Sequence, residues 1–329
     1  MKIRFKLSYN LVLFIICILL FVGFGIYNPA FFDSFYVAET AKMIMEIGIM
    51  SLPLTLLIVM AGIDFSMAST LVLAAALGGI VAMSTNPIIG MFVTFFVGLL
   101  CGGFNGFLIA FLRLPPLVTT LATMYLYKGL IRGLTLGNPR IGTNVSATSI
   151  AMFFGSGVIL GIPTQTWIFV FLAIIFYFLL GYTSYGRKLY AIGFNEDAAQ
   201  FSGINTKLVK FITYIITGFI FSIAGLVFMG RFSTIQFDSA DAYTMQVITA
   251  VVLGGADIRG GKGNVKGTVL GVMIIGFLRS GMNLIFLPQT QQKIVIGIIL
   301  LISLLVSEII NQRSVGIPGK NSSSVKTVS

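Results

Sequence analysis

Residues 211–230 read FITYIITGFIFSIAGLVFMG, an apolar run without a charged side chain. A helix of about 20 such residues is long enough to cross the ~30 Å hydrocarbon core of a bilayer. The whole chain has the same character, because 57% of its 329 residues are hydrophobic and only 9% are charged. A soluble domain usually carries about 25% charged residues, and disordered chains are poor in apolar ones. The sequence therefore predicts a polytopic membrane protein.

Similar runs recur along the chain and predict an all-α fold of about ten transmembrane helices. The expected spans are 11–27, 44–61, 66–83, 88–112, 117–136, 166–182, 211–230, 244–256, 265–287 and 294–310. The run 244–256 is too short to span alone, so it either borrows residues from its neighbours or re-enters without crossing. We expect residues 1–311 to form a single transmembrane domain and residues 312–329, which are rich in Ser, to form a flexible cytosolic tail.

The basic residues predict the orientation. Loops on the side of the N-terminus hold most of the Lys and Arg residues, among them Lys2, Arg4, Lys6, Arg113, Arg187, Lys188, Lys207, Lys210 and Lys262. Loops on the opposite side hold Lys42, Arg140, Arg231 and Lys293. Because positive charge collects on the cytoplasmic side, both termini are expected inside. The net charge of +11 then reflects membrane orientation, and nucleic acid is not an expected partner.

Several kinds of chemistry are excluded by the residues that the chain lacks. There is no histidine, so a Ser-His-Asp triad or a His-ligated metal is impossible. Cys17 and Cys101 lie in apolar runs and offer no disulfide framework or zinc site. No G-x-x-x-x-G-K-[ST] phosphate loop is present. We therefore expect neither an enzyme nor a metal site, and any ATPase that drives the protein must be another chain.

Three interruptions at membrane depth predict broken helices. Pro53 lies inside an apolar run and removes a backbone hydrogen bond. Residues 61–66 (AGIDFS) separate two runs, and Asp64 or Ser66 is expected to cap the following helix. A polar break at this depth must be buried in protein or line a water-filled cavity. A glycine-rich turn, with Gly254, Gly255, Gly260 and Gly261, is expected between the eighth and ninth spans.

The sequence of residues 195–203 predicts a short, well-capped helix in the loop after the sixth span. Asn195 is a good N-cap, and Glu196 begins an acidic first turn that complements the helix dipole. Ala198 and Ala199 favour helix, and Gly203 is a suitable C-terminal stop. Because two turns are marginal alone in water, this helix is expected to dock on another surface.

Here the sequence resembles a known family. Glu196-x-Ala198-Ala199-x-x-x-Gly203 is similar to the E-A-A…G coupling motif of ABC importer permeases. The longer pattern from Gly186-Arg187 to Asn195-Glu196 resembles the simple-sugar branch of these permeases, which carry ribose, xylose, galactose, rhamnose and autoinducer-2. Further matches occur in order along residues 28–305: GIDFS at 62–66, Asn105-Gly106 with LPPLVTTL at 114–121, AVVLGG at 250–255, and Gly260-Gly261-x-Gly263. The start of the chain and residues 48–55 look most like autoinducer-2 and rhamnose members. Ala68 replaces a glycine that is usual in the family.

The resemblance implies a type II ABC importer-like permease in the bacterial inner membrane. The implied partners are a second permease, identical or paralogous, two cytosolic ABC ATPases and an extracytoplasmic solute-binding protein. ATP and Mg would bind the ATPase, and no cofactor is expected in this chain. The resemblance assigns ATPase coupling to the residues Gly186, Arg187, Asn195, Glu196, Ala198, Ala199 and Gly203.

Residues of the translocation path are less well defined by the sequence. Arg279 is the ionisable residue well inside the ninth run, and Ser280 and Asn283 follow nearby. Arg279 either lines the path, snorkels outward, or pairs with a helix-end acid such as Glu46. Thr119 and Thr123 either bind solute or hydrogen-bond the preceding helical turn.

Two other functions compete with an ABC permease. An ion-coupled secondary transporter of a small polar solute needs intramembrane Asp, Glu or His, and we expect none near the centre of this bundle. A membrane-embedded transferase needs acidic or His metal ligands, yet neither a D-x-D nor an H-x-x-x-D pattern occurs.

Overall fold

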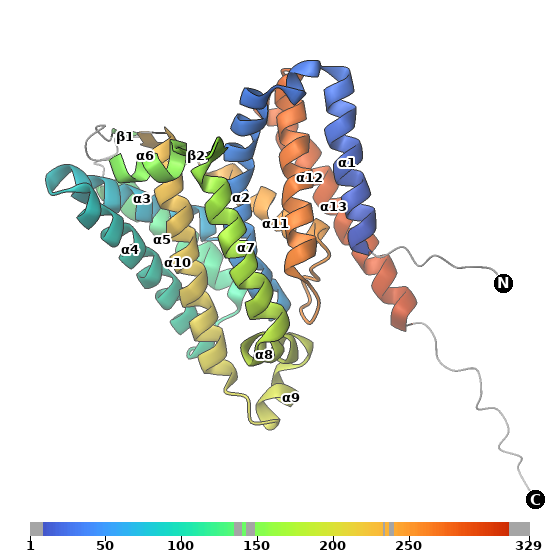
Figure 1. Ribbon diagram of the computed structural model, residues 1–329. Helices are drawn as coiled ribbons and strands as arrows, with labels where there is room; N and C mark the ends of the chain where they lie inside the picture. Colours follow the sequence, from blue (N-terminus) through green and yellow to red (C-terminus); the bar gives the residue numbers. More distant parts are fainter. Residues whose placement is uncertain (1–8, 135–139, 143–148, 233, 237–239, 316–329) are drawn as a thin grey trace, which may run out of the picture.

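The computed structural model describes residues 9–134, 140–142, 149–232, 234–236 and 240–315 (Figure 1). Helices dominate this part of the chain, and its strands form two two-stranded ribbons. The helices are α1 (Tyr9–Tyr27), η1 (Pro29–Phe32), α2 (Ser34–Val59), α3 (Met67–Ser84), α4 (Pro87–Ala110), α5 (Pro116–Leu134), α6 (Ser149–Ser156), α7 (Thr164–Tyr182), α8 (Ser184–Phe194), α9 (Glu196–Phe201), α10 (Thr206–Phe232), α11 (Asp241–Leu253), α12 (Val265–Leu284) and α13 (Gln289–Val315). The strands β1 (Arg140–Gly142) and β4 (Thr234–Gln236) pair antiparallel, as do β2 (Val158–Ile159) and β3 (Ile162–Pro163).

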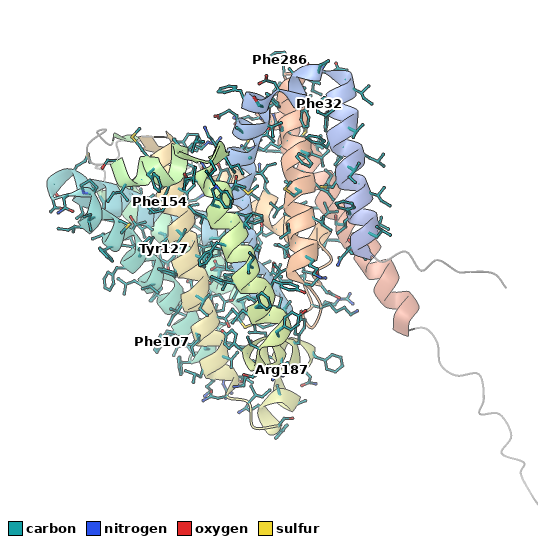
Figure 2. The ribbon with its side chains drawn as sticks, in the orientation of Figure 1. Phe32, Phe107, Tyr127, Phe154, Arg187 and Phe286 are labelled. Atoms are coloured by element: carbon teal, nitrogen blue, oxygen red, sulfur yellow. The ribbon has the colours of Figure 1, made fainter. Side chains whose placement is uncertain are left out.

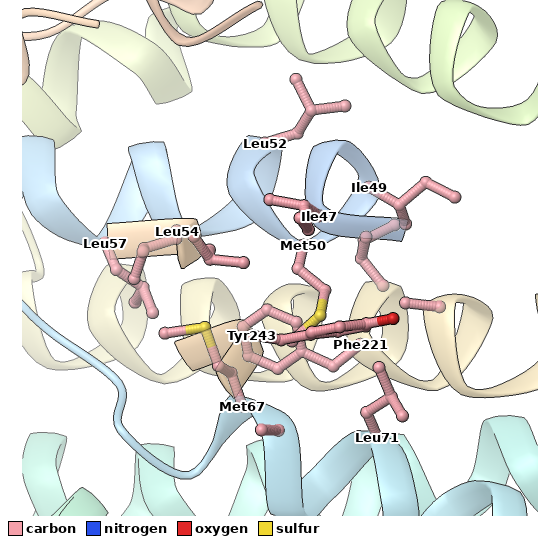
Figure 3. Packing of buried hydrophobic residues seen from close by; sticks show 14 of the residues in the cluster. Ile47, Ile49, Met50, Leu52, Leu54, Leu57, Met67, Leu71, Phe221 and Tyr243 are labelled. Carbon is pink, nitrogen blue, oxygen red and sulfur yellow. The ribbon is translucent and has the colours of Figure 1, made fainter. Parts of the chain in front are cut away.

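Helix α2 is the centre of the bundle. It begins behind Asp33, whose side chain accepts the N–H groups of Phe35 and Tyr36, and it contacts α7, α10, α11 and α12. Residues 44–60 are all buried, and their apolar side chains pack with Met67 of α3 and Phe221 of α10 (Figure 3). The apolar surface of α2 is therefore enclosed by other helices.

The expected interruption at Pro53 is wrong, because α2 is helical from Ser34 to Val59. Proline costs one backbone hydrogen bond inside a helix. Such a proline is tolerated in membrane helices where neighbouring helices, Ser or Thr side chains or local backbone adjustments satisfy the freed backbone groups again. Pro53 is buried on all sides, and this enclosure was not evident from the local sequence.

Two groups of helices flank α2 (Figure 1). Helices α3, α4, α5, α6 and α10 lie on one side, and α1, α11, α12 and α13 lie on the other. Helices α4 and α10 touch through small residues, and a Cβ on Gly102 would overlap the Tyr214 carbonyl oxygen. Glycine here allows the two helix backbones to approach closely, as small residues commonly do between membrane helices.

Most of each expected span is helical, which confirms the all-α membrane class. Seven helices of the described residues are long and apolar enough to cross a bilayer: α1, α2, α3, α4, α7, α10 and α12. Helix α11 has only 13 residues, so ten crossings remain a prediction. Helix α13 continues to Val315, four residues beyond the expected start of the tail, and residues 316–329 lie outside the described part.

Candidate functional site

Helices α8 and α9 project from the end of the bundle opposite η1, where Arg187 is labelled (Figure 2). The Thr183 hydroxyl caps α8 by accepting the N–H of Gly186 at 3.1 Å. A Cβ on Gly186 would overlap the Leu180 carbonyl oxygen of α7, so glycine permits the sharp turn between the two helices. Leu189 is buried beneath α8, whereas Arg187 is exposed.

Helix α9 has the limits that the sequence predicts. The Asn195 side-chain oxygen accepts the N–H of Ala198 at 2.9 Å, which caps the first turn. Gly203 follows the helix with φ of +84°, a left-handed conformation that glycine adopts without strain. The predicted cap and stop are therefore confirmed as local structure.

Two exposed aromatic rings flank α9, one on the last residue of α8 and one on the last residue of α9. Phe194 is 89% exposed and Phe201 is 92% exposed, while Ala199 is buried beneath the helix. The Glu196 carboxylate lies 2.5 Å from Lys210 Nζ, which ties α9 to α10.

Helix α8 connects α9 to the core of the bundle through main-chain contacts at the C-terminal end of α2. The N–H of Gly261 donates to the Val59 carbonyl at 2.8 Å, and a Cβ on Gly193 would overlap the same carbonyl oxygen. A Cβ on Gly260 would lie 2.7 Å from both the Ala61 Cβ and the Gly193 carbonyl oxygen. We call this meeting of α2, α8 and residues 254–264 the glycine junction, and define it by these five residues.

A tyrosine adds a side-chain bond beside the glycine junction. The Tyr190 hydroxyl donates to the Gly263 carbonyl at 2.7 Å. Burial raises the pKa of the Tyr190 phenol, so the hydroxyl stays protonated and remains a donor. The expected turn at Gly254, Gly255, Gly260 and Gly261 is confirmed, with positive φ at the last three of these glycines. Gly193 lies within the sequence pattern from Gly186 to Glu196, but the sequence alone predicts no role for it.

The polar side chains of the interruption between α2 and α3, Asp64 and Ser66, are buried, as predicted. Asp64 Oδ1 accepts the backbone N–H of Ser66 at 2.7 Å and its hydroxyl at 2.6 Å. Asn105 of α4 donates to the same hydroxyl at 2.8 Å, and Asp64 is only 2% exposed. The expected helix cap differs from this arrangement, since Ser66 makes no side-chain cap bond and Asp64 binds the residue before the helix.

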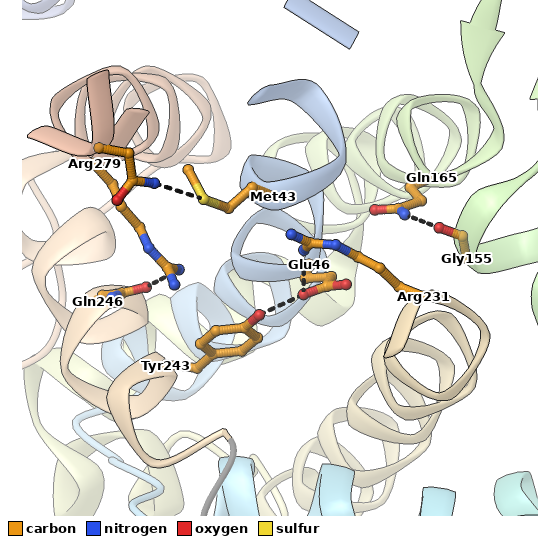
Figure 4. Close-up of polar contacts among 9 residues, drawn as sticks. Met43, Glu46, Gly155, Gln165, Arg231, Tyr243, Gln246 and Arg279 are labelled. Atoms are coloured by element: carbon orange, nitrogen blue, oxygen red, sulfur yellow. Dashed lines mark hydrogen bonds and ion pairs between the residues drawn. The ribbon is translucent and has the colours of Figure 1, made fainter. Parts of the chain in front are cut away.

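A second polar assembly lies in the half of the bundle nearer η1, and its residues come from four helices (Figure 4). We call it the arginine cluster, and it consists of Glu46, Arg231, Tyr243, Gln246 and Arg279. Glu46 Oε2 lies 3.1 Å from Arg231 Nη1 and accepts the Tyr243 hydroxyl at 2.5 Å. Arg279 donates to Gln246 at 2.9 Å and lies 5.7 Å from the Tyr243 ring centroid. Tyr243 thus separates the two guanidinium groups.

The arginine cluster corrects two expectations. Glu46 has no exposed surface, so the expectation that no acidic residue lies deep in the bundle is wrong. The expected span began at residue 44, which placed Glu46 near a helix end, whereas α2 begins at Ser34. The carboxylate pairs with Arg231, a residue that the sequence placed in an outer loop, and Arg279 contacts Gln246 instead. No spacing in the sequence connects these helices.

The other predicted path residues do not converge on one site. Ser280 is buried against α2, where its hydroxyl lies 2.6 Å from that of Thr40. Asn283 is exposed and accepts a bond from Gln292. The hydroxyls of Thr119 and Thr123 donate to carbonyls of the preceding helical turn, and that of Thr119 lies 2.9 Å from the Pro115 carbonyl. This was the expected alternative to solute binding. No group of three metal-ligating side chains occurs among the described residues.

These features define a class of protein: a polytopic helical membrane protein with a buried helix interruption and a capped helix exposed at one end. Comparison then gives the family. Residues 36–304 match the family described as "Branched-chain amino acid transport system / permease component", and the chain belongs to it. It is a permease component of a transport system in the bacterial plasma (inner) membrane, and not an enzyme.

Individual relatives agree with the resemblance to sugar importer permeases. The chain is 35% identical to the ribose import permease protein RbsC of Bacillus subtilis over 303 residues, 91% of this chain and 92% of the relative. It is 33% identical over 280 residues to RbsC of Escherichia coli K12, which covers 85% and 87% of the two chains. It is also 33% identical over 301 residues to the autoinducer 2 import system permease protein LsrD of Enterobacter sp. 638, which covers 90% and 92%. No solved structure matches the chain significantly.

Proposed function

We propose that this chain is the membrane permease of an ATP-binding-cassette importer for a small sugar or a sugar-like solute, such as a pentose, rhamnose or autoinducer-2. The ordered sugar-permease motifs support this class of solute, as do relatives that are named for ribose and autoinducer-2. The family description names branched-chain amino acids. Uptake of labelled ribose, rhamnose, autoinducer-2 and leucine by cells with the complete transporter distinguishes the two classes.

The proposed topology has ten crossings, with both termini in the cytoplasm. Helices α5, α11 and α13 then supply the three crossings that length and hydropathy alone do not assign. Cytosolic ABC ATPases carry the ATP and Mg, and an extracytoplasmic solute-binding protein delivers the solute. Residues 1–311 act as one domain beside a second permease, either identical or paralogous. Cysteine labelling from each side of the membrane tests this orientation.

The observation that carries the mechanism is the glycine junction. We propose that α9, with the residues from Gly186 to Gly203, docks on an ATPase and moves when the ATPase closes. Because no side chain separates Gly193 from the Val59 carbonyl, a displacement of α8 presses directly on α2. Helix α2 contacts both flanking helix groups, so its movement would change the path between them. Arg279 keeps a proposed role in that path.

Substitution of Glu196 tests the coupling role. Glu196→Ala combined with Gly203→Ala should leave membrane insertion intact and abolish ATP-driven uptake. Glu39→Ala, which removes an exposed carboxylate from α2, is the control and should keep uptake. Retained uptake in the double variant would contradict the proposed coupling.

Buried Glu46 favours a second candidate, an ion-coupled transporter, because such proteins use intramembrane carboxylates. The pairing with Arg231 and Tyr243 gives Glu46 a structural role instead. The candidates differ in energy source. Uptake that survives a protonophore but fails without the ATPase supports the importer, and the opposite result supports ion coupling.

A further inference from the structure

A groove of about 690 Å³ opens on the side of the bundle between α1, α7 and α12. Its walls are almost entirely apolar, with Phe14 of α1, Ala173 of α7 and Leu270 of α12 among them. These helices are distant in sequence, and the groove lies in the half of the bundle that carries α8 (Figure 1). In the proposed orientation this half faces the cytoplasmic leaflet.

A lysine ammonium and two tyrosine hydroxyls lie beside one end of the groove. Lys266, the second residue of α12, lies with Nζ 5.0 Å from the centroid of the Tyr177 ring. The Tyr177 hydroxyl lies 2.9 Å from that of Tyr182. Lys266 is exposed, and none of the ion pairs found within the described residues includes it. The groove therefore has an apolar wall and a cation with two hydroxyls at the same membrane boundary.

We propose that this groove binds one anionic phospholipid of the cytoplasmic leaflet. The acyl chains lie along α7 between Ala173 and Tyr177, and the phosphate lies at Lys266. Basic pockets between membrane helices on the cytoplasmic side suit anionic headgroups, and the cytoplasmic leaflet supplies such lipids. A zwitterionic lipid fills the same apolar wall, but its own ammonium group offsets its phosphate, so it brings no net negative charge to the lysine. The proposal concerns a site that the transport function does not use.

The lipid site also lies beside the glycine junction. Lys266 lies two residues after residues 254–264, and the Tyr9 hydroxyl of α1 donates to the Leu253 carbonyl at 2.8 Å just before them. A lipid that bridges α1, α7 and α12 would hold this segment of chain in place. Binding is therefore expected to restrict the movement of the segment that touches α2 and α8.

Native mass spectrometry of the purified full-length chain tests the proposal with phosphatidylglycerol and phosphatidylcholine of matched acyl chains. We expect phosphatidylglycerol to bind at least five-fold more tightly, the equivalent of the ~1 kcal/mol that one basic residue contributes at a membrane surface. Lys266→Gln should remove this preference and leave phosphatidylcholine binding unchanged. Lys207→Gln, on an exposed lysine at the start of α10, should keep the preference.

A groove-filling variant provides an independent measurement. Ala173→Trp should reduce binding of both lipids without removing Lys266. Equal binding of the two lipids by the unmodified chain, or a preference that survives Lys266→Gln, would overturn the proposal. Because the measurement uses neither ATPase nor solute, its failure leaves the proposed transport function untouched, and failure of uptake leaves the lipid site untouched.

Discussion

The glycine junction and the arginine cluster join the same helix, α2, to its neighbours by opposite means. At the junction, main-chain atoms of Val59, Gly193 and Gly260 touch, and added atoms would overlap. In the cluster, long side chains meet around the buried carboxylate of Glu46. Contacts without side chains have no rotamers to adjust, whereas arginines can change partner. We infer that the junction transmits displacement and the cluster holds the helices together.

The largest expected effect is at the arginine cluster. Glu46→Ala leaves Arg231 buried without its counter-charge and should cost about 3–5 kcal/mol of stability. Thermal unfolding of the purified protein measures the loss. The control is Glu39→Ala, since the Glu39 carboxylate is 44% exposed and its pair with Lys42 should contribute less than about 1 kcal/mol. Equal losses in the two variants would remove the distinction between the cluster and a surface ion pair.

The double variant Glu46→Gln with Arg231→Gln tests whether Glu46 stabilises the protein through its pairing with Arg231. Removing both partners avoids an unpaired buried charge, so part of the lost stability should return relative to Glu46→Gln alone. No recovery would mean that Glu46 acts mainly on Arg279.

A smaller stability effect but a larger functional one is expected at the glycine junction. Gly193→Ala places a methyl group against the Val59 carbonyl and should cost about 1–3 kcal/mol. Uptake should fall at least ten-fold, because α8 can no longer lie against α2. Gly181→Ala in α7 is the matched control, since no atom lies within 4 Å of the added Cβ. Normal uptake with Gly193→Ala would mean that the junction does not transmit movement.

The next smaller effect is expected at Gly203, the residue at which α9 ends. Gly203 has φ of +84°, so Gly203→Ala should cost about 1–2 kcal/mol locally. Gly203→Asn should cost less, because asparagine tolerates this conformation better than alanine. Hydrogen exchange across residues 196–204 and ATP-driven uptake should rank the variants in the same order. Identical exchange in all three proteins would contradict the role of the glycine.

The smallest expected effect is at the cap of α9. Asn195→Ala removes the bond to the Ala198 N–H and should cost about 1 kcal/mol. Asn195→Asp should restore most of it, because aspartate is an equally good N-cap. Hydrogen exchange of α9 is the measurement, and a failure of Asp to rescue would show that the amide has another role.

Sequence patterns within a few helical turns predicted most of the secondary structure of this protein. Long apolar runs identified most of the helices, and the cap and stop of α9 were readable at Asn195 and Gly203. Errors occurred where a residue's environment depends on other helices. Pro53 is a helix breaker by itself, yet α2 continues because its neighbours enclose it. Glu46 was assigned to a helix end because its span was expected to start too late.

The sequence by itself determined the membrane class, the helical fold and the family motifs, because these depend on composition and on spacing within a few turns. The tertiary structure decided which residues meet. The pairing of Glu46 with Arg231 joins positions 46 and 231, and the contact of Gly193 with Val59 joins positions 193 and 59. No local pattern encodes such contacts. They arise because several helices enclose α2, and two of them, α10 and α8, supply these partners.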